Sequence, residues 1–136
     1  MSQLSWKWLA GFFDGEGCIS VARQNPGQPP SAVRLSISQN GVQSWVLDEI
    51  NEFLETAGVL TYLRPLAETG QRDVQISEFD SVEYVLKRLS PHLIVKKARA
   101  EECLRYMREV RKLKKEHGKW WLRHVTSVPA PLRVSN

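Results

Sequence analysis

The sequence predicts an α+β domain in the order helix, hairpin, helix, hairpin, helices. Two observations support this. Apolar and polar residues alternate in the strands of residues 18–39, which is typical of half-buried strands, and a second hairpin is expected over residues 59–78. Apolar residues recur at helical spacing before, between and after these segments. Two hairpins can join into one curved, four-stranded antiparallel sheet that carries helices on one face and leaves the other face open.

The opening segment is expected to be a helix that begins after Ser5, whose side chain can cap it, and ends at about Asp14. A first hairpin over residues 18–39 should follow, with its turn at the sequence NPGQPP. One face of its two strands should be buried. The apolar positions on that face are Ile19, Val21, Val33, Leu35 and Ile37.

Two capping boxes follow the first hairpin. NGVQ, with Asn40 as the cap, predicts a helix that Gly58 ends, and strands 59–66 and 71–78 then turn at AETG. DSVE, with Asp80 as the cap, predicts a third helix that ends at Pro91. A basic helix is expected from Ala98 to about His117, and KWWLRH adds a short turn of helix.

Length and composition indicate the class of protein. A chain of 136 residues, 42% hydrophobic and 25% charged, is typical of one globular domain, which we place at residues 1–124 with a tail at 125–136. No apolar run suits a membrane span, and the N-terminus lacks a secretory pattern, so a cytoplasmic or nucleoid location is expected and no membrane partner. Cys18 and Cys103 form no metal or redox motif and are expected to be buried free thiols.

The open face of the predicted sheet carries small side chains and hydrogen-bond donors with few acids. Such a face suits a DNA groove, where base edges are read by donors, acceptors and small groups, although an ordinary solvated face has a similar composition. We add Tyr62, Arg72 and Asp73 of the second hairpin as candidate DNA contacts. The residues assigned to the face itself are Ser20, Ala22, Gln24, Arg34, Ser36, Ser38, Arg64 and Gln75.

Charge is unevenly distributed along the chain. The net charge is +4, and eleven Lys and Arg face four acids between Lys96 and Arg123. This basic segment either lies along a phosphate backbone or forms the solvated face of an amphipathic helix.

The opening helix, with the sequence LAGFFDGEG, has no polar face. Trp8, Gly11, Phe12 and Gly15 fall on one side, and small residues one turn apart let two helix backbones approach closely. The natural partner is the same helix of a second subunit, around a two-fold axis. The alternative is a central helix buried inside a monomer.

Glu16 follows at the tip of that contact, where the two-fold axis would bring it close to its symmetry mate. Two adjacent carboxylates at the negative ends of two helices repel each other, unless a divalent cation neutralises them. Oxygen ligands of this kind suit Mg²⁺, or another divalent cation such as Mn²⁺. A metal ion beside a DNA backbone can activate water, so the stretch predicts a metal-dependent site.

The stretch WLAGFFDGEGCI resembles the signature of the LAGLIDADG homing endonucleases, with Glu16 in the last acidic position. One copy in a short chain is similar to the single-motif members, which act as homodimers. The resemblance implies that Glu16 and the carbonyl of Gly15 bind metal. It also implies that Gln39 and Lys96, with Lys97 beside it, order water around the scissile phosphates. Gln43 stands where the family often has a basic residue, so either it positions water alone or Lys97 supplies the charge.

The resemblance therefore implies a Mg²⁺-dependent homodimer that cuts both strands of a long, partly palindromic DNA site and leaves short 3′ overhangs. It implies double-stranded DNA as the substrate, no small-molecule substrate, and a compartment that bears introns or inteins, organelles included. Asp14 is expected to be structural. One alternative is a non-cleaving protein of the same fold, either an RNA maturase or a DNA-binding regulator. Another is a plain dimerisation module, which leaves Gly11 and Glu16 unexplained.

Overall fold

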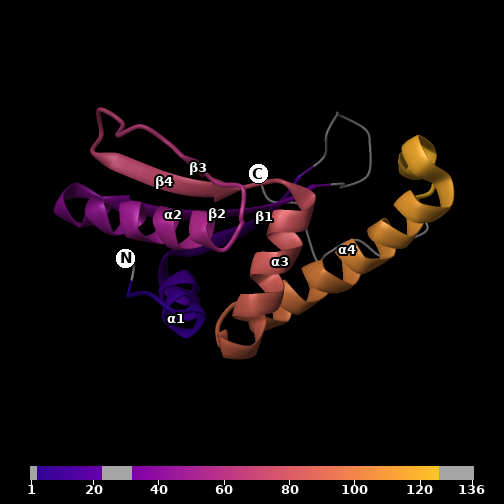
Figure 1. The fold of residues 1–136 in the computed structure, drawn as a ribbon, viewed down its shortest axis with the longest axis horizontal. Coiled ribbons are helices and arrows are strands. Elements are labelled where there is room, and N and C mark those ends of the chain that lie inside the picture. The colour runs from indigo at the N-terminus through magenta and orange to yellow at the C-terminus, as the bar shows by residue number, and fades with distance from the viewer. Residues whose placement is uncertain (1–2, 23–31, 126–136) are drawn as a thin grey trace.

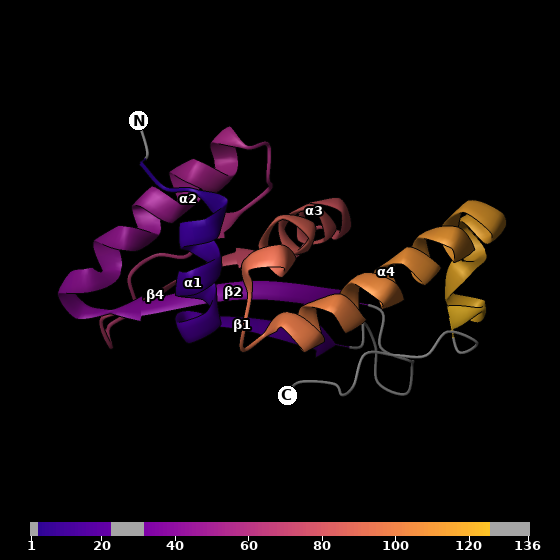
Figure 2. The ribbon, with the colours of Figure 1, turned by 90° about the horizontal axis from the view of Figure 1, so that it is seen from below.

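The computed structural model describes residues 3–22 and 32–125 and confirms the predicted α+β class. Helices α1, α2 and α3 lie on one side of a four-stranded sheet, and α4 runs outward beyond it (Figures 1 and 2). Short 3₁₀ helices, η1 to η3, join some of these elements. The bounds are α1 Trp6–Glu16, β1 Gly17–Ala22, β2 Ala32–Asn40, η1 Gly41–Trp45, α2 Val46–Thr56, β3 Tyr62–Leu63, β4 Gln71–Ile76, α3 Phe79–Leu89, η2 Ser90–His92, α4 Lys97–His117 and η3 Gly118–Arg123.

The sheet is antiparallel, and its strand order is β1-β2-β4-β3. β2 pairs with both β1 and β4 and so joins the two hairpins. Ile19, Leu35 and Ile76 lie side by side across three strands, and all three are buried. Buried residues alternate with more exposed ones along the strands, and the helices lie on the buried face (Figure 2), so the other face is open as the sequence predicts.

Helix α1 begins as predicted, because the Ser5 hydroxyl accepts a hydrogen bond of 3.1 Å from the amide of Trp8. It ends at Glu16, two residues later than expected, since the amide of Gly17 still reaches the carbonyl of Phe13. Leu9, Ala10 and Phe13 are buried against the chain's own core. A Cβ at position 17 would overlap the Phe13 ring, so only glycine fits where the helix enters β1.

The predicted cap of the second helix is wrong. Asn40 makes no side-chain capping bond and instead ends β2, opposite Gln71. The chain then forms η1, and α2 starts only at Val46. Gly41, with a φ of +63°, makes the turn, and its amide donates to the carbonyl of Gly70 at 3.2 Å. The positive φ at Gly41 diverts the chain, which the capping pattern alone does not reveal.

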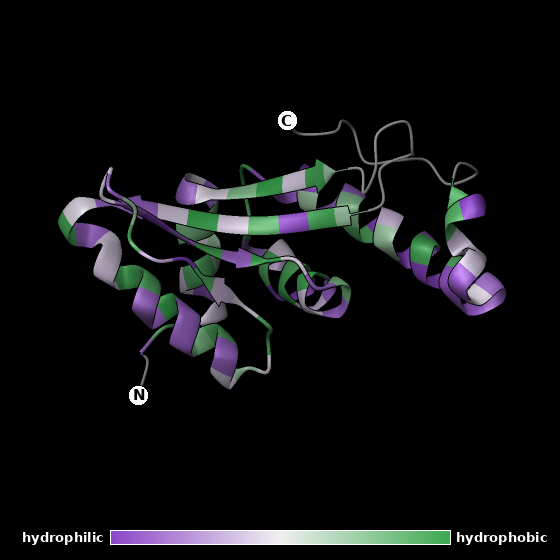
Figure 3. Cartoon of the chain, turned by 90° about the horizontal axis from the view of Figure 1, so that it is seen from above, coloured by the Kyte–Doolittle hydropathy of each residue, from purple (hydrophilic) through white to green (hydrophobic). Residues whose placement is uncertain are grey.

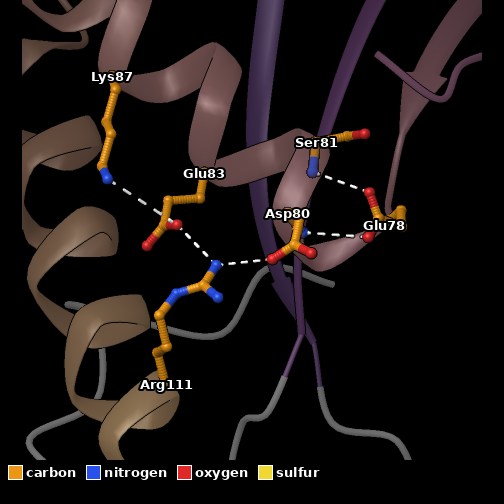
Figure 4. Close-up of polar contacts among 6 residues, drawn as sticks. All are labelled: Glu78, Asp80, Ser81, Glu83, Lys87 and Arg111. Atoms are coloured by element: carbon orange, nitrogen blue, oxygen red, sulfur yellow. Dashed lines mark hydrogen bonds and ion pairs between the residues drawn. The ribbon is translucent and has the colours of Figure 1, made fainter. Parts of the chain in front are cut away.

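The cap of α3 also differs from the prediction. Glu78, not Asp80, caps the helix, and its carboxylate accepts from the amides of Ser81 at 2.9 Å and Asp80 at 3.3 Å. The hydrogen bonds from Ser81 hold the pKa of Glu78 below its usual value. Asp80 and Glu83 are thereby left for Arg111 of α4, which donates to them at 2.6 and 2.7 Å (Figure 4).

The second hairpin is shorter than the predicted strands 59–66 and 71–78. Val59 and Leu60 bond elsewhere, since their amides donate to the carbonyl of Leu54 and the hydroxyl of Ser81, each at 3.0 Å. Pro65 has no amide to continue a ladder. β3 is therefore confined to Tyr62–Leu63.

The far half of α4 builds a second apolar cluster away from the sheet. Tyr106, Val110 and Val125 are buried there, and Trp121 and Leu122 pack against them. Val125, which the sequence placed in the tail, thus belongs to the folded part. Gly118, with a φ of +56°, ends α4 as predicted. In the ranges that the structure describes, no helix is long and apolar enough to cross a membrane.

Candidate active site and DNA interface

Three of the four predicted interface residues, Trp8, Gly11 and Gly15, are exposed on one side of α1, whereas Phe12 is half-buried and also packs against the core. The Trp8 ring is 41% exposed and stacks on Phe12, with ring centroids 5.2 Å apart and planes 9° apart. Gly11 and Gly15 are exposed, and a Cβ added at either would meet no atom within 4 Å. In the single chain this side of the helix is therefore flat, partly aromatic and open.

Glu16 is exposed and is the last residue of α1. The strand that follows it, β1, is an edge strand, so the carboxylate lies at one border of the sheet. Within the residues described, no three His, Cys, Asp or Glu side chains gather into a metal site. The carboxylate of Glu16 and the carbonyl of Gly15 are the oxygen donors that this end of the helix offers.

Asp14 fastens the start of α4 to the end of α1. Its carboxylate accepts from the amides of Ile94 at 2.7 Å and Lys96 at 3.0 Å, and the Lys96 ammonium donates to the Asp14 carbonyl at 2.6 Å. Burial pushes the pKa of Asp14 upward, but the amides of residues 94–96 and the charge of Lys96 outweigh it and hold the pKa below 3.8. Asp14 thus has the structural role that was expected, and it holds Lys96 close to the end of α1, because Asp14 precedes Glu16 by two residues in sequence.

Replacing Asp14 with asparagine should lower the free energy of unfolding by about 1–3 kcal/mol at pH 7, because the hydrogen bonds from the amides of Ile94 and Lys96 lose their charged acceptor. A lowered pKa means that Asp14 contributes stability above pH 4, and that this contribution disappears as the pH falls through the folded-state pKa. Urea unfolding at pH 7 and pH 3 measures this, with the exposed Glu52→Gln as control. An equal loss at both pH values would contradict the assignment.

The other predicted catalytic residues lie at the end of β2 and the start of α4. Gln39 is half-buried, opposite Arg72 in the β2–β4 pair. Gln43 is exposed in η1, and Lys97 is the exposed first residue of α4. Among the predicted catalytic residues, Lys96 is the one that hydrogen-bonds to α1 in the described part of the chain.

Arg72 does not lie on the open face with the other candidate contacts. It has the same strand parity as the buried Val74 and Ile76, and it points toward the helices. There its guanidinium donates to both carboxylate oxygens of Asp48 on α2, at 3.0 and 3.1 Å. Arg72 therefore links the sheet to α2, and the prediction that it contacts DNA from the open face is wrong.

The remaining candidates form rows across the open face, which Figure 3 shows from above as alternating polar and apolar positions along the long strands. One row crosses all four strands, and two shorter rows flank it. Gln24 lies outside the described residues. The rows are Cys18–Ser36–Gln75–Tyr62, Ser20–Arg34 and Ser38–Asp73–Arg64, and Ala22 pairs with Ala32 at the distal end.

The electrostatics of this face favour an anionic partner. Its acid, Asp73, lies 3.5 Å from the Arg64 guanidinium and accepts from the Gln75 amide at 3.0 Å. Arg34 is exposed and forms no hydrogen bond or ion pair within the described part of the chain. Its donors are therefore available to a ligand.

The sequence missed three members of the open face, Cys18, Asn40 and Gln71. Cys18 was expected to be buried but is exposed, whereas Cys103 is buried as predicted. Strand parity could have found Cys18 and Gln71, since they alternate with Ile19 and with the buried residues of β4. Asn40 was hidden by its resemblance to a helix cap.

The two thiols should therefore react differently. At pH 8 a maleimide reagent should label Cys18 within minutes, while burial protects Cys103 and raises its pKa to about 11. Mass spectrometry of digested protein identifies the labelled thiol. The Cys18→Ser variant is the control and should stay unlabelled until the protein is unfolded. Labelling of native Cys103 at a similar rate would contradict the structure.

Comparisons with known proteins agree with this geometry. The model of a family described as LAGLIDADG endonuclease matches residues 9–101. DNA endonuclease I-CvuI of Chlorella vulgaris is 28% identical over 117 residues, which cover 79% of this chain. The match spans 66% of that relative, just under two thirds of its length.

Solved structures show the same fold. Homing endonuclease I-CvuI in complex with a DNA target in 2 mM Mg, with the DNA not cleaved, has a TM-score of 0.67 at 23% identity, covering 98% of this chain and 87% of that one. Homing endonuclease I-TnaI has a TM-score of 0.65 at 20% identity, covering 93% and 83%. I-GzeII in complex with its DNA target has a TM-score of 0.69 at 14% identity, covering 93% of this chain but 43% of that one.

Proposed function

Because this chain belongs to the LAGLIDADG endonuclease family, we propose that it is a homing endonuclease that cuts both strands of a long, partly palindromic DNA site as a metal-dependent homodimer. The observation that carries the proposal is the placement of Glu16. Its exposed carboxylate ends a helix with an open, small-residue side and lies at the border of a polar sheet face. A randomised duplex library incubated with Mg²⁺ tests the activity, and sequenced ends should converge on one site.

Two features support a second copy of the chain as the partner. Gly11 and Gly15 let another helix approach the backbone of α1, since nothing fills the space where their side chains would be. One copy of this fold also accounts for less than half of the I-GzeII chain. A single copy would then supply half of a two-fold site, with its own Glu16 as one of two acids.

The donor set at the end of α1 fits a hard divalent cation. Carboxylate and carbonyl oxygens are the ligands that Mg²⁺ takes in proteins, and Glu16 and Gly15 present one of each in an exposed position. When bound, such a cation activates water and stabilises the leaving oxygen. The relative I-CvuI was studied on DNA targets with Mg in one case and Ca in another. We therefore propose Glu16 and Gly15 as the metal ligands from each subunit.

The remaining residues act on water and phosphate. The Lys96 ammonium donates one hydrogen bond to the Asp14 carbonyl, which leaves two N–H groups for a scissile phosphate or its water. Gln39, Gln43 and Lys97 lie on the neighbouring β2–η1 segment and at the start of α4, where their side chains would order further water. Gln43 is neutral, so Lys96 and Lys97 carry the positive charge of the proposed site.

The open sheet face would read the DNA. β2 has nine residues, which span about 30 Å, close to nine base pairs at about 3.4 Å each. A dimer would then recognise roughly twenty base pairs. Only β2 has this length among the described strands, so β2 is expected to set the extent of each half-site.

Replacing Arg34 with alanine should relax base preference at one or two positions in each half-site, at a cost of about 1–3 kcal/mol per half-site, because its free guanidinium is suited to a guanine edge. Cleavage profiling over all single-base variants of the target measures this. Arg108→Ala, an exposed arginine on α4, is the control and should change all sequences alike or none. An Arg34→Ala profile equal to that of the wild type would show that this face does not read bases.

A further inference from the structure

We propose that the exposed side of α4, together with η3, is a second nucleic-acid site that binds a single strand through its phosphates and one stacked base. The site is separate from the sheet and goes beyond the proposed cleavage function. Its cationic part, which we term the α4 stripe, consists of five exposed residues. These are Arg105, Arg108, Lys112, Lys115 and Lys119.

Four members of the α4 stripe lie on one face of the helix. Arg105, Arg108, Lys112 and Lys115 are three or four residues apart on α4. Lys119 follows in η3, after Gly118 has ended the helix. From Arg105 to Lys115 the helix rises about 15 Å, and η3 extends the surface further. Single-strand sites accommodate about four nucleotides or more, which is compatible with this length.

The cations of α4 divide into two groups, and only one is used inside the protein. Arg111 is neutralised by Asp80 and Glu83 of α3 (Figure 4). The Lys114 ammonium lies 3.8 Å from the Phe79 ring centroid and 4.9 Å from that of Trp121, and burial lowers its pKa. These inward cations hold α4 to α3 and to the second apolar cluster.

The outward cations have no such partners. Arg105, Arg108 and Lys115 make no hydrogen bond or ion pair with any residue that the structure describes. Lys112 pairs only with Glu109 of the same helix, at 3.1 Å with both side chains exposed, which is worth little in water. Without the inward Arg111 and Lys114, residues 105–123 hold six basic residues and two acidic ones, so the surface remains positive.

An aromatic ring completes the surface at the end of the stripe. Trp120 is 50% exposed, with the Arg123 guanidinium 4.2 Å and the Lys119 ammonium 5.0 Å from its ring centroid. The next residue, Trp121, packs into the second apolar cluster instead. An exposed indole beside cations is a stacking platform for an unpaired base, while a paired base presents no free face.

The placement of this surface keeps it apart from the sheet. Figures 1 and 2 show the far half of α4 and η3 projecting away from the sheet and from α1. A strand bound there would leave the open face of the sheet and Glu16 accessible. The α4 stripe would bind the phosphates, and stacking of an unpaired base on Trp120 would select single strands over duplexes.

Anisotropy of a labelled twelve-nucleotide oligo(dT), measured over a range of salt concentrations, tests the proposal. A variant that combines Arg105→Gln, Arg108→Gln and Lys115→Gln should bind at least tenfold more weakly, and its salt slope should fall by about 2, because three phosphate contacts are lost. Trp120→Leu should weaken binding about tenfold. Binding of the oligonucleotide to the wild type should quench the tryptophan fluorescence of the protein, and Trp120→Leu should lose most of this quenching. The same measurement with a labelled oligo(rU) shows whether the site prefers RNA to DNA.

Lys7→Gln removes one exposed charge from α1, away from the α4 stripe, and is the control for the loss of charge, so it should bind as the wild type does. All variants should melt at the wild-type temperature, since the changed side chains are exposed. Wild-type binding by the triple variant, or equal competition by a duplex of the same length, would overturn the proposal. Loss of oligo(dT) binding in Arg34→Ala would place the site on the sheet and would overturn it too.

Discussion

Replacing Glu16 with glutamine should abolish cleavage while DNA binding is retained or tightened. The substitution keeps the shape of the side chain and removes the charge that would hold the cation. The cleavage rate should therefore fall more than about 100-fold, which exceeds the loss typical of a residue that only hydrogen-bonds to a metal ligand. Binding should not fall, because the carboxylate also repels the phosphates. Gel shifts and cleavage assays on the same target measure the two effects separately.

Glu52→Gln is the matched control, because Glu52 is an exposed carboxylate on α2. It should cut and bind as the wild type does. Removal of divalent cations with EDTA should reproduce the behaviour of Glu16→Gln in the wild-type protein. Cleavage by Glu16→Gln at the wild-type rate would place the metal site elsewhere.

Replacing Gly11 with leucine should give a folded monomer that no longer cuts. In the single chain a Cβ at Gly11 meets nothing within 4 Å, and leucine favours the helix by up to about 1 kcal/mol over glycine. The chain should therefore fold, and only the approach of a second α1 should be blocked. Multi-angle light scattering gives the mass, and circular dichroism confirms the fold.

Gly17→Ala provides the contrast for this experiment. Its Cβ would overlap the ring of Phe13, which is fully buried, so the variant should lose about 1–3 kcal/mol of stability while the α1 surface is unchanged. The folded fraction of Gly17→Ala should still dimerise. An unchanged dimer in Gly11→Leu, or a monomeric wild type, would refute the interface.

The fold follows from local patterns wherever one face of an element is buried. Alternation around Ile19 and Leu35 predicted the first hairpin, and the stripe of Val82, Val85 and Leu86 predicted α3. The errors arise where a long-range partner competes with a local signal. Val59 and Leu60 satisfy their amides through α2 and α3 rather than through a strand.

The candidate site depends even more on contacts that are distant in sequence. The bonds between Asp14 and Lys96 join residues 82 apart, and Arg72 reaches Asp48 across 24. Strand parity separates Arg72, which alternates in step with the buried Val74, from the exposed Arg34, but no local pattern identifies Asp48 as the partner of Arg72. Glu16 could be identified as a candidate metal ligand because a short stretch of consecutive residues shows both its carboxylate and its position at the end of a helix.

Mapping the cut ends on both strands of the selected target, with Mg²⁺ and with EDTA, tests most directly whether two copies of Glu16 form one metal-dependent site. The account predicts one cut on each strand, at positions related by the two-fold axis of the site, with short 3′ overhangs, and no cut in EDTA. Cleavage of a single strand only, ends without two-fold symmetry, or cutting that persists in EDTA would contradict it.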